Sequence, residues 1–323
     1  MTNQVALLVA PGEHGHFEIR EQALVEPGEG QIRIRHQAIG TNFLDIYHRK
    51  GLYPLPSYPA VIGVEAAGIV EAVGSGVLEF AEGDRVAYAG PPVGAYASWR
   101  IAEAERVVKL PDAVAVKTAA TSLLKGMTAY MLLEKTYPVK AGDTILVHAA
   151  AGGLGGLLVR GAKARGARVI GTVGSQEKAA AALASGADQL IVGRDADLVA
   201  EVHALTGGRG VDVAYDGIGG GMLVKTVRSV RPFGTAATIG QAGGPIPPIA
   251  VEELRPGKSL SHPSIMAWCA DVARYREAAI SALRAIEAGI VSQVGSEYRL
   301  DEAAAAHAEM ESGRSTGSIV LLP

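Results

Sequence analysis

The spacing of apolar residues changes about a third of the way along the chain. In the first third, apolar and polar positions alternate in short runs, and Gly, Pro or Asp residues separate these runs. Clear examples are residues 31–35, 68–74 and 84–88. A period of two is typical of half-buried strands, so residues 1–125 are predicted to be mainly β. Residues 42–50 are the exception and form a short predicted helix.

From residue 126 onward, apolar strands alternate with alanine-rich helices. The predicted strands are residues 144–148, 168–173, 189–192, 211–216 and 234–239, and the helices include residues 157–167, 176–185 and 196–206. This alternation implies a parallel sheet with helices on both faces. Beyond Pro263, helices at residues 272–288 and 301–312 precede an apolar strand at residues 318–322, which is expected to return to the first domain.

These patterns predict an α/β protein with two domains. A length of 323 residues is enough for two separate cores. One domain is assigned to residues 1–125 and 264–323 and is mainly β, whereas residues 126–263 form a doubly wound, parallel-sheet domain.

A glycine-rich run joins the first predicted strand of the second domain to its helix. Residues 148–156 read His-Ala-Ala-Ala-Gly-Gly-Leu-Gly-Gly. A strand, a glycine-rich turn and a helix in this order are typical of dinucleotide binding. Gly152 lets the backbone approach a pyrophosphate, Gly155 lets the helix pack closely on the strand, and the first N–H groups of the helix point at the anion. The alternative is a turn that serves packing alone.

The end of the second strand favours NADPH over NADH. NAD-binding domains usually carry an acidic residue there for the ribose hydroxyls, but this strand ends in Gly174 and Ser175, followed by Lys178. Without a carboxylate to repel it, a 2′-phosphate is able to accept hydrogen bonds from Ser175 and Lys178. Arg194, just after the third strand, is a second candidate cation. The alternative for Lys178 is a solvated helix lysine.

Charge and composition exclude several classes of function. The net charge is −3, and no basic cluster suggests a nucleic acid or an anionic membrane as partner. The single cysteine, Cys269, excludes an intrachain disulfide and a zinc site with two or more cysteine ligands. Neither a signal peptide nor a membrane span is evident, so a soluble, cytoplasmic protein is expected. His14 and His16 are expected in an exposed loop, and His148 in the core.

Several segments, in order along the whole chain, resemble one family. They are residues 40–45, 49–54, 63–70, 124–130, 148–155, 171–174 and 314–317. These segments are similar to those of the zinc-free, zeta-crystallin-like quinone oxidoreductases of the medium-chain dehydrogenase/reductase superfamily. In zinc-bearing relatives a histidine stands at the position of Val64. The resemblance implies a GroES-like catalytic domain built from both ends of the chain, a Rossmann domain, NADPH as hydride donor and a homodimer.

The resemblance also implies the roles of individual residues. The catalytic positions, near the nicotinamide, are Asn42, Tyr47, Tyr53 and Thr128. The cofactor-binding positions are Thr128, Gly152, Gly153, Leu154, Gly174, Ser175, Lys178, Arg194, Gly240 and Arg314. The same residues have structural interpretations: Asn42 as a helix cap, the two tyrosines and Thr128 as packing residues, and Glu65 as support for a strand turn.

Three positions depart from the family pattern. Relatives often carry a tyrosine at Gly193, an arginine at His262 and a lysine at Ser318. Losing an aromatic contact and two cations is expected to loosen NADPH binding.

The expected reaction is reduction of a quinone by NADPH without zinc, by one or by two electrons at a time. Tyr53 is the candidate hydrogen-bond donor to the phenolate-like oxygen, and Asn42 is an orienting group. Two alternatives stay open: an NADPH-dependent reductase of enones or alkenals, and a cofactor-binding protein with little turnover.

Overall fold

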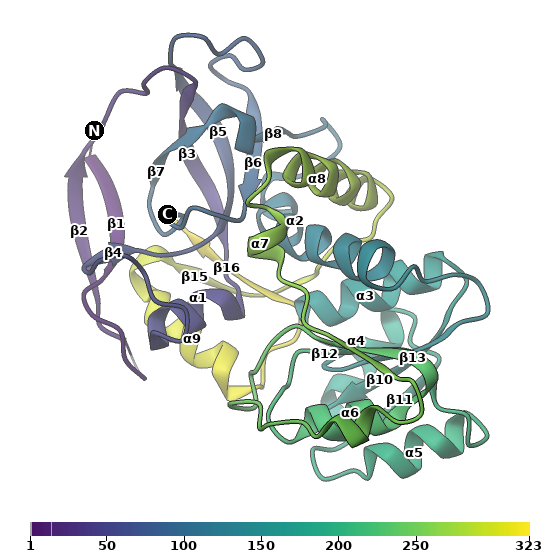
Figure 1. Cartoon of the computed structure of the whole chain (residues 1–323). Helices are drawn as coiled ribbons and strands as arrows, with labels where there is room; N and C mark the ends of the chain where they lie inside the picture. Colours follow the sequence, from purple (N-terminus) through teal and green to yellow (C-terminus); the bar gives the residue numbers. More distant parts are fainter. Residues whose placement is uncertain (1, 14) are drawn as a thin grey trace. The chain divides into compact units, whose positions relative to one another are not determined.

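The structure is a computed structural model that describes residues 2–13 and 15–323, so His14 lies outside the described residues. The chain folds into two compact units (Figure 1). Unit 1 comprises residues 1–127 and 265–323, and unit 2 comprises residues 128–264. None of the described helices combines the length and the apolar character that a membrane crossing requires.

Unit 1 is mainly β. Its strands are β1 (Thr2–Leu8), β2 (Phe17–Ala23), β3 (Gln31–Gly40), β4 (Ala60–Val61), β5 (Glu65–Val73), β6 (Arg85–Ala89), β7 (Trp99–Glu103), β8 (Val108–Lys109), β15 (Val294–Arg299) and β16 (Ser318–Leu322). Its helices are α1 (Phe43–Lys50), the larger part of α2 (Val116–Tyr130), α7 (Ile265–Trp268), α8 (Val272–Glu287) and α9 (Ala303–Ser312), with 3-10 turns at Ala104–Arg106 and Leu300–Glu302.

Two sheets organise unit 1. A small sheet has the order β2-β1-β4, and a larger one has the order β15-β16-β3-β5-β6-β8, with β7 also paired to β3. The predicted alternation is visible in β3, where Ile32 and Ile34 are buried in the core. The last strand, β16, pairs with β3 so that Val320 lies opposite Gly40. The C-terminal strand therefore returns to the sheet formed by the first third of the chain.

Unit 2 contains one parallel sheet. Its strands are β9 (Thr144–Val147), β10 (Arg168–Val173), β11 (Gln189–Val192), β12 (Val211–Asp216), β13 (Val230–Thr238) and β14 (Ser259–Ser261). Its helices are α3 (Gly153–Ala164), α4 (Ala179–Ala184), α5 (Leu198–Leu205) and α6 (Met222–Ser229), with a π-helical segment at Met131–Thr136 and 3-10 turns at Gln176–Lys178 and Val251–Leu254.

The strand order of unit 2 is that of a Rossmann sheet. The six strands lie in the order β11-β10-β9-β12-β13-β14, and every pair is parallel. Counted along the chain, this is the order 3-2-1-4-5-6, whose direction reverses beside the first strand, β9. Ligands of such sheets bind at the carboxyl ends of the strands at this reversal. The glycine-rich turn follows β9 and is therefore at the expected place.

Several predicted boundaries are wrong, and β13 begins at Val230 rather than at residue 234. Residues 116–125 are not β but belong to helix α2 (Val116–Tyr130), where Ala119, Leu123 and Met127 recur at helical spacing and are buried. Helix α3 begins at Gly153 rather than at Leu157. Glycine has a poor helix propensity, so the sequence alone places the start of this helix one turn too late.

Candidate functional site

The glycine-rich turn of unit 2 presents backbone donors at the start of α3. Gly152 is the N-cap residue, and its carbonyl accepts the Gly156 N–H at 2.8 Å, in the first turn of the helix. The N–H groups of Gly153, Leu154 and Gly155 precede this bond and have no acceptor within the helix. Together with the positive end of the helix dipole, they form an anion-binding site of the kind that holds a pyrophosphate.

Gly155 makes this turn possible. A Cβ at this position would lie 2.1 Å from the carbonyl oxygen of Ala149, a backbone atom that can shift only together with the turn or the helix. Ala149 itself has a φ of 50°, and the Gly152 N–H closes the turn on the Ala149 carbonyl at 2.8 Å. The turn and the helix therefore pack as closely as the sequence pattern predicts, and the donor set fits a dinucleotide phosphate.

Two cations gather at the carboxyl end of β10. Burial lowers the pKa of Lys178, and repulsion from Arg194 lowers it further. A Cβ at Gly174 would lie 3.5 Å from Nε of Arg194, so this guanidinium lies next to the end of the strand. The predicted residues Gly174, Lys178 and Arg194 are thus close together in unit 2.

Ser175 has a partner that the sequence analysis missed. Its hydroxyl donates to the carboxylate of Glu177, and this bond lowers the pKa of Glu177. A phosphate at this position would have to compete with Glu177 for the Ser175 hydroxyl.

A buried polar network joins the ends of three strands in unit 2. Nδ1 of His148 lies 3.1 Å from the Thr172 hydroxyl, and Nε2 lies 2.9 Å from the Thr226 hydroxyl. Thr226 donates its own hydrogen to Asp216 at 2.7 Å, so the hydrogen between Thr226 and His148 belongs to Nε2. Burial lowers the pKa of His148 and keeps the ring neutral. His148 is the hydrogen-bonded core residue that the sequence predicts.

Asp216 carries this network into the neighbouring loops. Its carboxylate accepts the N–H groups of Ile218 and Gly219 at 2.7 and 3.0 Å. The carbonyl of Gly240, which follows β13, lies 2.9 Å from where a Cβ of Gly219 would stand. Gly240 therefore belongs to the loops at the same end of the parallel sheet as the glycine-rich turn.

In unit 1, helix α1 and the turn after it hold three of the predicted catalytic residues. Asn42 is the N-cap residue of α1. Tyr47 is buried in the same helix, and its ring centroid lies 5.4 Å from that of Tyr53 in an edge-to-face arrangement. Tyr53 is 39% exposed. The structural interpretations of Asn42 as a cap and of Tyr47 as a packing residue are thus confirmed, and they are compatible with a catalytic role.

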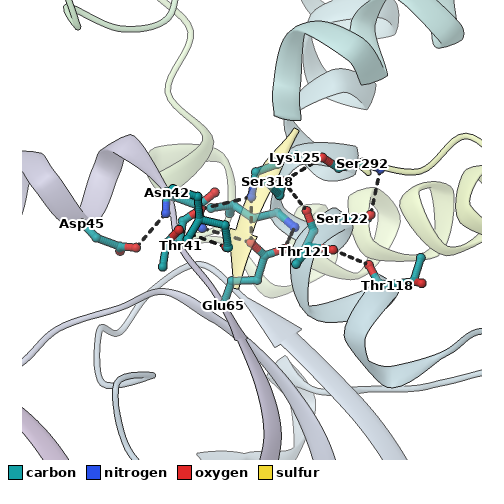
Figure 2. Close-up of polar contacts among 12 residues, drawn as sticks. Thr41, Asn42, Asp45, Glu65, Thr118, Thr121, Ser122, Lys125, Ser292 and Ser318 are labelled. Atoms are coloured by element: carbon teal, nitrogen blue, oxygen red, sulfur yellow. Dashed lines mark hydrogen bonds and ion pairs between the residues drawn. The ribbon is translucent and has the colours of Figure 1, made fainter. Parts of the chain in front are cut away.

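Glu65 is a site residue that sequence reasoning undervalued. It begins β5, is fully buried, and accepts hydrogen bonds from the Leu124 N–H at 2.7 Å and from the Asn42 side-chain amide at 3.0 Å. The ammonium of Lys125 lies 3.5 Å from the same carboxylate and also donates to the carbonyl of Thr41 at 3.3 Å. Figure 2 shows this group, with Glu65 between Asn42 and the side chains of α2.

A second buried group lies on the other side of Asn42. Asp45 accepts the Asn42 backbone N–H at 2.9 Å and the Tyr96 hydroxyl at 3.1 Å. Tyr96 also contacts Nε2 of His307 at 2.8 Å. Burial raises the pKa of Asp45 to about 7 and lowers the pKa of His307 to about 3.

The two remaining predicted residues, Thr128 and Arg314, belong to different units. Thr128 lies three residues after Lys125 in α2, within unit 2. Arg314 belongs to unit 1, whereas the other predicted cofactor residues belong to unit 2; its backbone N–H donates to the hydroxyl of Ser312 at 3.2 Å.

The three departures from the family pattern have distinct surroundings. Gly193 has a φ of 107°, a conformation that would strain a tyrosine. His262 is exposed. Ser318 is buried, and its hydroxyl lies 2.6 Å from that of Ser292 and 3.3 Å from the Thr121 carbonyl.

Among residues 2–13 and 15–323, no group of three or more His, Cys, Asp or Glu side chains is placed to hold a metal ion. Val64, at the position of a histidine in zinc-bearing relatives, is buried. Cys269 is also buried, and this raises the pKa of its thiol to about 12.

Known protein families and relatives match both units of the chain. Residues 28–112 match the alcohol dehydrogenase GroES-like domain, and residues 153–268 match the zinc-binding dehydrogenase family. Quinone oxidoreductase 1 of Escherichia coli is 40% identical over 96% of this chain and 98% of its own length. The 2-haloacrylate reductase of a Burkholderia species is 41% identical over 98% of both chains.

A solved structure agrees with the same assignment. The crystal structure of Escherichia coli quinone oxidoreductase complexed with NADPH has a TM-score of 0.94 and 37% identity, and the match covers 99% of this chain and all of that one. The predicted fold class is confirmed, and the predicted activity and cofactor agree with those of the relatives. The chain belongs to the quinone oxidoreductases of the medium-chain dehydrogenase/reductase superfamily.

Proposed function

We propose that this protein reduces quinones with NADPH. The observation that carries the proposal is the donor set of Gly153, Leu154 and Gly155 after β9, at the reversal of strand order, where Gly155 brings turn and helix together. Lys178 and Arg194 add the positive charge that the 2′-phosphate of NADPH requires. The quinone oxidoreductase relatives and the NADPH complex of the Escherichia coli protein support the same function.

The roles of the chain's own residues follow from this proposal. Bound NADPH supplies the hydride. Gly152 lets the pyrophosphate approach the backbone, and Gly153, Leu154 and Gly155 donate their N–H groups to it. Lys178 and Arg194 hold the adenosine phosphate. Thr128 and Arg314 are proposed as further cofactor contacts, and Gly174, Ser175 and Gly240 as the loop positions beside it.

At the quinone, one oxygen gains negative charge as the ring is reduced. Tyr53, which is 39% exposed, donates a hydrogen bond to that oxygen. Tyr47 packs edge-to-face against Tyr53 and fixes the direction of its ring, and Asn42 orients the bound molecule. The product is the hydroquinone once protons from the solvent neutralise its oxygens.

A second candidate is the reduction of an activated alkene. The similarity to 2-haloacrylate reductase, 41% identity over 98% of both chains, favours it. In this reaction a hydride from NADPH adds to the β-carbon of the alkene and a proton adds to the α-carbon. The cofactor residues would be the same, and only the residues around the acceptor would differ in role.

The experiment that tests the proposal is steady-state oxidation of NADPH and NADH by chelator-treated protein, with a quinone and 2-chloroacrylate as parallel acceptors. Consumption of NADPH with the quinone is expected. Turnover with 2-chloroacrylate alone would assign the protein to alkene reduction. Binding of NADPH without its consumption by either acceptor would contradict both activities and favour a cofactor-binding protein.

We also propose a homodimer in the cytoplasm. The homodimer is supported by the family resemblance, and the location by a single cysteine that is buried rather than paired in a disulfide.

A further inference from the structure

The backbone and the side chain of Asn42 make hydrogen bonds to different residues. Its N–H donates to the Asp45 carboxylate at 2.9 Å, and its carbonyl accepts the Asp45 N–H at 2.9 Å. These two bonds fix the backbone at the start of α1. The side-chain amide of Asn42 completes a capping box with the first turn of α1, and its NH₂ group donates to the Glu65 carboxylate at 3.0 Å.

The space around Glu65 is built to keep this carboxylate in place. Gly40 lies beside it, and a Cβ there would be 2.7 Å from Oε2 of Glu65 and 2.0 Å from the carbonyl of Ala120. The Leu124 N–H fixes Oε1 at 2.7 Å. Lys125, whose side chain is 10% exposed, brings an ammonium to 3.5 Å from Oε2 and compensates the buried charge.

A carboxylate without a proton accepts hydrogen bonds and cannot donate them. The amide of Asn42 must therefore turn its NH₂ group toward Glu65. Because nitrogen and oxygen lie on opposite branches of the amide, the carbonyl oxygen of Asn42 is directed away from Glu65. Figure 2 shows Asn42 between the Glu65 carboxylate and the Asp45 side chain.

We propose that Glu65 is a positioning residue that makes Asn42 a hydrogen-bond acceptor toward the bound reactants. This inference rests on the proposed function, in which Asn42 contacts those reactants. The group that Asn42 recognises is consequently a donor, an N–H or O–H, carried by the cofactor or by the reduced product. Asn42 therefore does not stabilise the phenolate-like oxygen, and that role is left to Tyr53.

Three variants test the direction of the amide. In Glu65→Gln, the Leu124 N–H still donates to the carbonyl oxygen of the introduced amide, so the NH₂ group of that amide faces Asn42. The Asn42 amide then rotates to accept from this NH₂ group, and its own NH₂ group is presented to the bound reactants. A fall in kcat/KM of roughly ten- to a hundredfold is expected. In Asn42→Asp two carboxylates face each other, and a larger loss is expected.

The double variant is the decisive one. In Asn42→Asp/Glu65→Gln, the carboxylate introduced at position 42 accepts a hydrogen bond from the NH₂ group introduced at position 65. Its second oxygen again presents an acceptor to the bound reactants, and the pair keeps one negative charge beside Lys125. Its kcat/KM is expected to exceed that of Glu65→Gln by about tenfold. A double variant no more active than Glu65→Gln, or a Glu65→Gln enzyme with wild-type kinetics, would overturn the proposal.

Glu71→Gln serves as the matched control. Glu71 lies on the same strand, and its carboxylate also has two donors, Arg35 at 2.7 Å and the Trp99 indole at 2.5 Å. Its substitution removes a comparable bonded carboxylate from β5 without touching Asn42. Wild-type kcat/KM is expected for this variant, whatever its effect on stability.

Two binding measurements locate the donor that Asn42 recognises. If the donor belongs to the cofactor, Glu65→Gln weakens NADPH binding in the absence of acceptor. If it belongs to the reduced product, the variant weakens inhibition by hydroquinone and leaves the NADPH Kd unchanged. An unchanged value in both measurements would overturn the proposal.

A spectroscopic measurement separates this inference from the proposed function. The side-chain NH₂ signals of Asn42, identified by their loss in Asn42→Ala, are expected to exchange slowly and to move in Glu65→Gln. If the wild-type protein reduces neither acceptor, the proposed function fails, and these signals still report the amide direction. Signals that Glu65→Gln leaves in place would contradict the amide direction even in an active enzyme.

Discussion

Burial lowers the pKa of Lys178, and the nearby positive charge of Arg194 lowers it further. A bound 2′-phosphate would bring a negative charge to both cations and lower their mutual repulsion. Glu177 holds the Ser175 hydroxyl nearby, so the discrimination between NADPH and NADH depends on the two cations more than on Ser175.

Lys178→Glu is expected to weaken NADPH binding much more than NADH binding. Loss of a charge-assisted hydrogen bond corresponds to roughly a ten- to hundredfold increase in the Kd of NADPH, and the new carboxylate adds repulsion. Titration of both cofactors by fluorescence measures the effect. Lys225→Glu, an exposed position on α6, makes the same charge change as a control. Equal losses for both cofactors would show that Lys178 does not face the phosphate.

At the scale of the element, the start of α3 depends on a glycine that has no room for a side chain. In Gly155→Ala the new methyl group would meet the Ala149 carbonyl at 2.1 Å, and the turn or the helix must move. We expect at least about a tenfold weaker affinity for NADPH, because the displaced N–H groups no longer converge on the pyrophosphate.

Gly152→Ala provides a graded comparison in the same turn. Its methyl group would lie 3.2 Å from the same carbonyl, and the residue has an ordinary φ of −81°. Calorimetric titration with NADPH should therefore show a smaller loss than for Gly155→Ala. The reverse order, or unchanged binding in Gly155→Ala, would refute the close-approach argument.

Elements with a clear apolar period could be predicted from the sequence, and elements without one could not. Strands β10, β11, β12 and β16 have the predicted bounds, because each is a short, apolar run between turn residues. Strand β14 is short and its residues are exposed or half-buried, so no alternation marks it. Helix α2 directly follows a β-rich region, so the neighbouring sequence suggests a strand. The burial of one face of the helix against the rest of the fold stabilises it as a helix.

The candidate site divides in the same way. The glycine-rich turn, Ser175 and Lys178 lie near one another in sequence, and a local motif indicates them. Glu65 and Lys125 are 60 residues apart, and only the pairing of β3 with β5 and the position of α2 bring them to Asn42. No local pattern carries that information, so the sequence alone indicates for Glu65 only the support of a strand turn.

At the scale of the whole molecule, unit 1 buries titratable groups whose effects on stability have opposite signs. Burial lowers the pKa of His36 to about 4 and that of His307 to about 3, from 6.5. The unfolded chain therefore binds protons on these rings below pH 6.5, and unit 1 loses stability as the pH falls. Burial also lowers the pKa of His48, which acts in the same direction.

Asp45 acts in the opposite direction. Burial raises its pKa from 3.8 to about 7, so the folded state retains a proton that the unfolded chain releases. Between pH 7 and 4 this group stabilises unit 1 increasingly as the pH falls, by about 1.4 kcal/mol per pH unit. Asp45 thus offsets part of the acid destabilisation caused by the histidines.

Asp45→Asn is expected to steepen the loss of stability at acid pH. Asparagine mimics the protonated carboxyl and keeps the acceptor for Asn42 and Tyr96, but it cannot gain a proton as the pH falls. The free energy of unfolding of the variant should therefore drop more steeply than that of the wild type, by about 1.4 kcal/mol per pH unit between pH 7 and 4.

The two tryptophans make this measurement specific to one unit. Trp99 and Trp268 are the only tryptophans of the chain, and both belong to unit 1, so urea unfolding followed by their fluorescence reports on the unit that contains Asp45. Asp112→Asn, an exposed position in the same unit, is the matched control and should keep the wild-type slope. If the free energies of unfolding of Asp45→Asn and of the wild type change in parallel from pH 7 to 4, Asp45 is ionised in the folded state over this range. The carboxylate then has a stabilising partner beyond the Asn42 N–H and the Tyr96 hydroxyl, and the buried group beside Asn42 carries a full negative charge at pH 7.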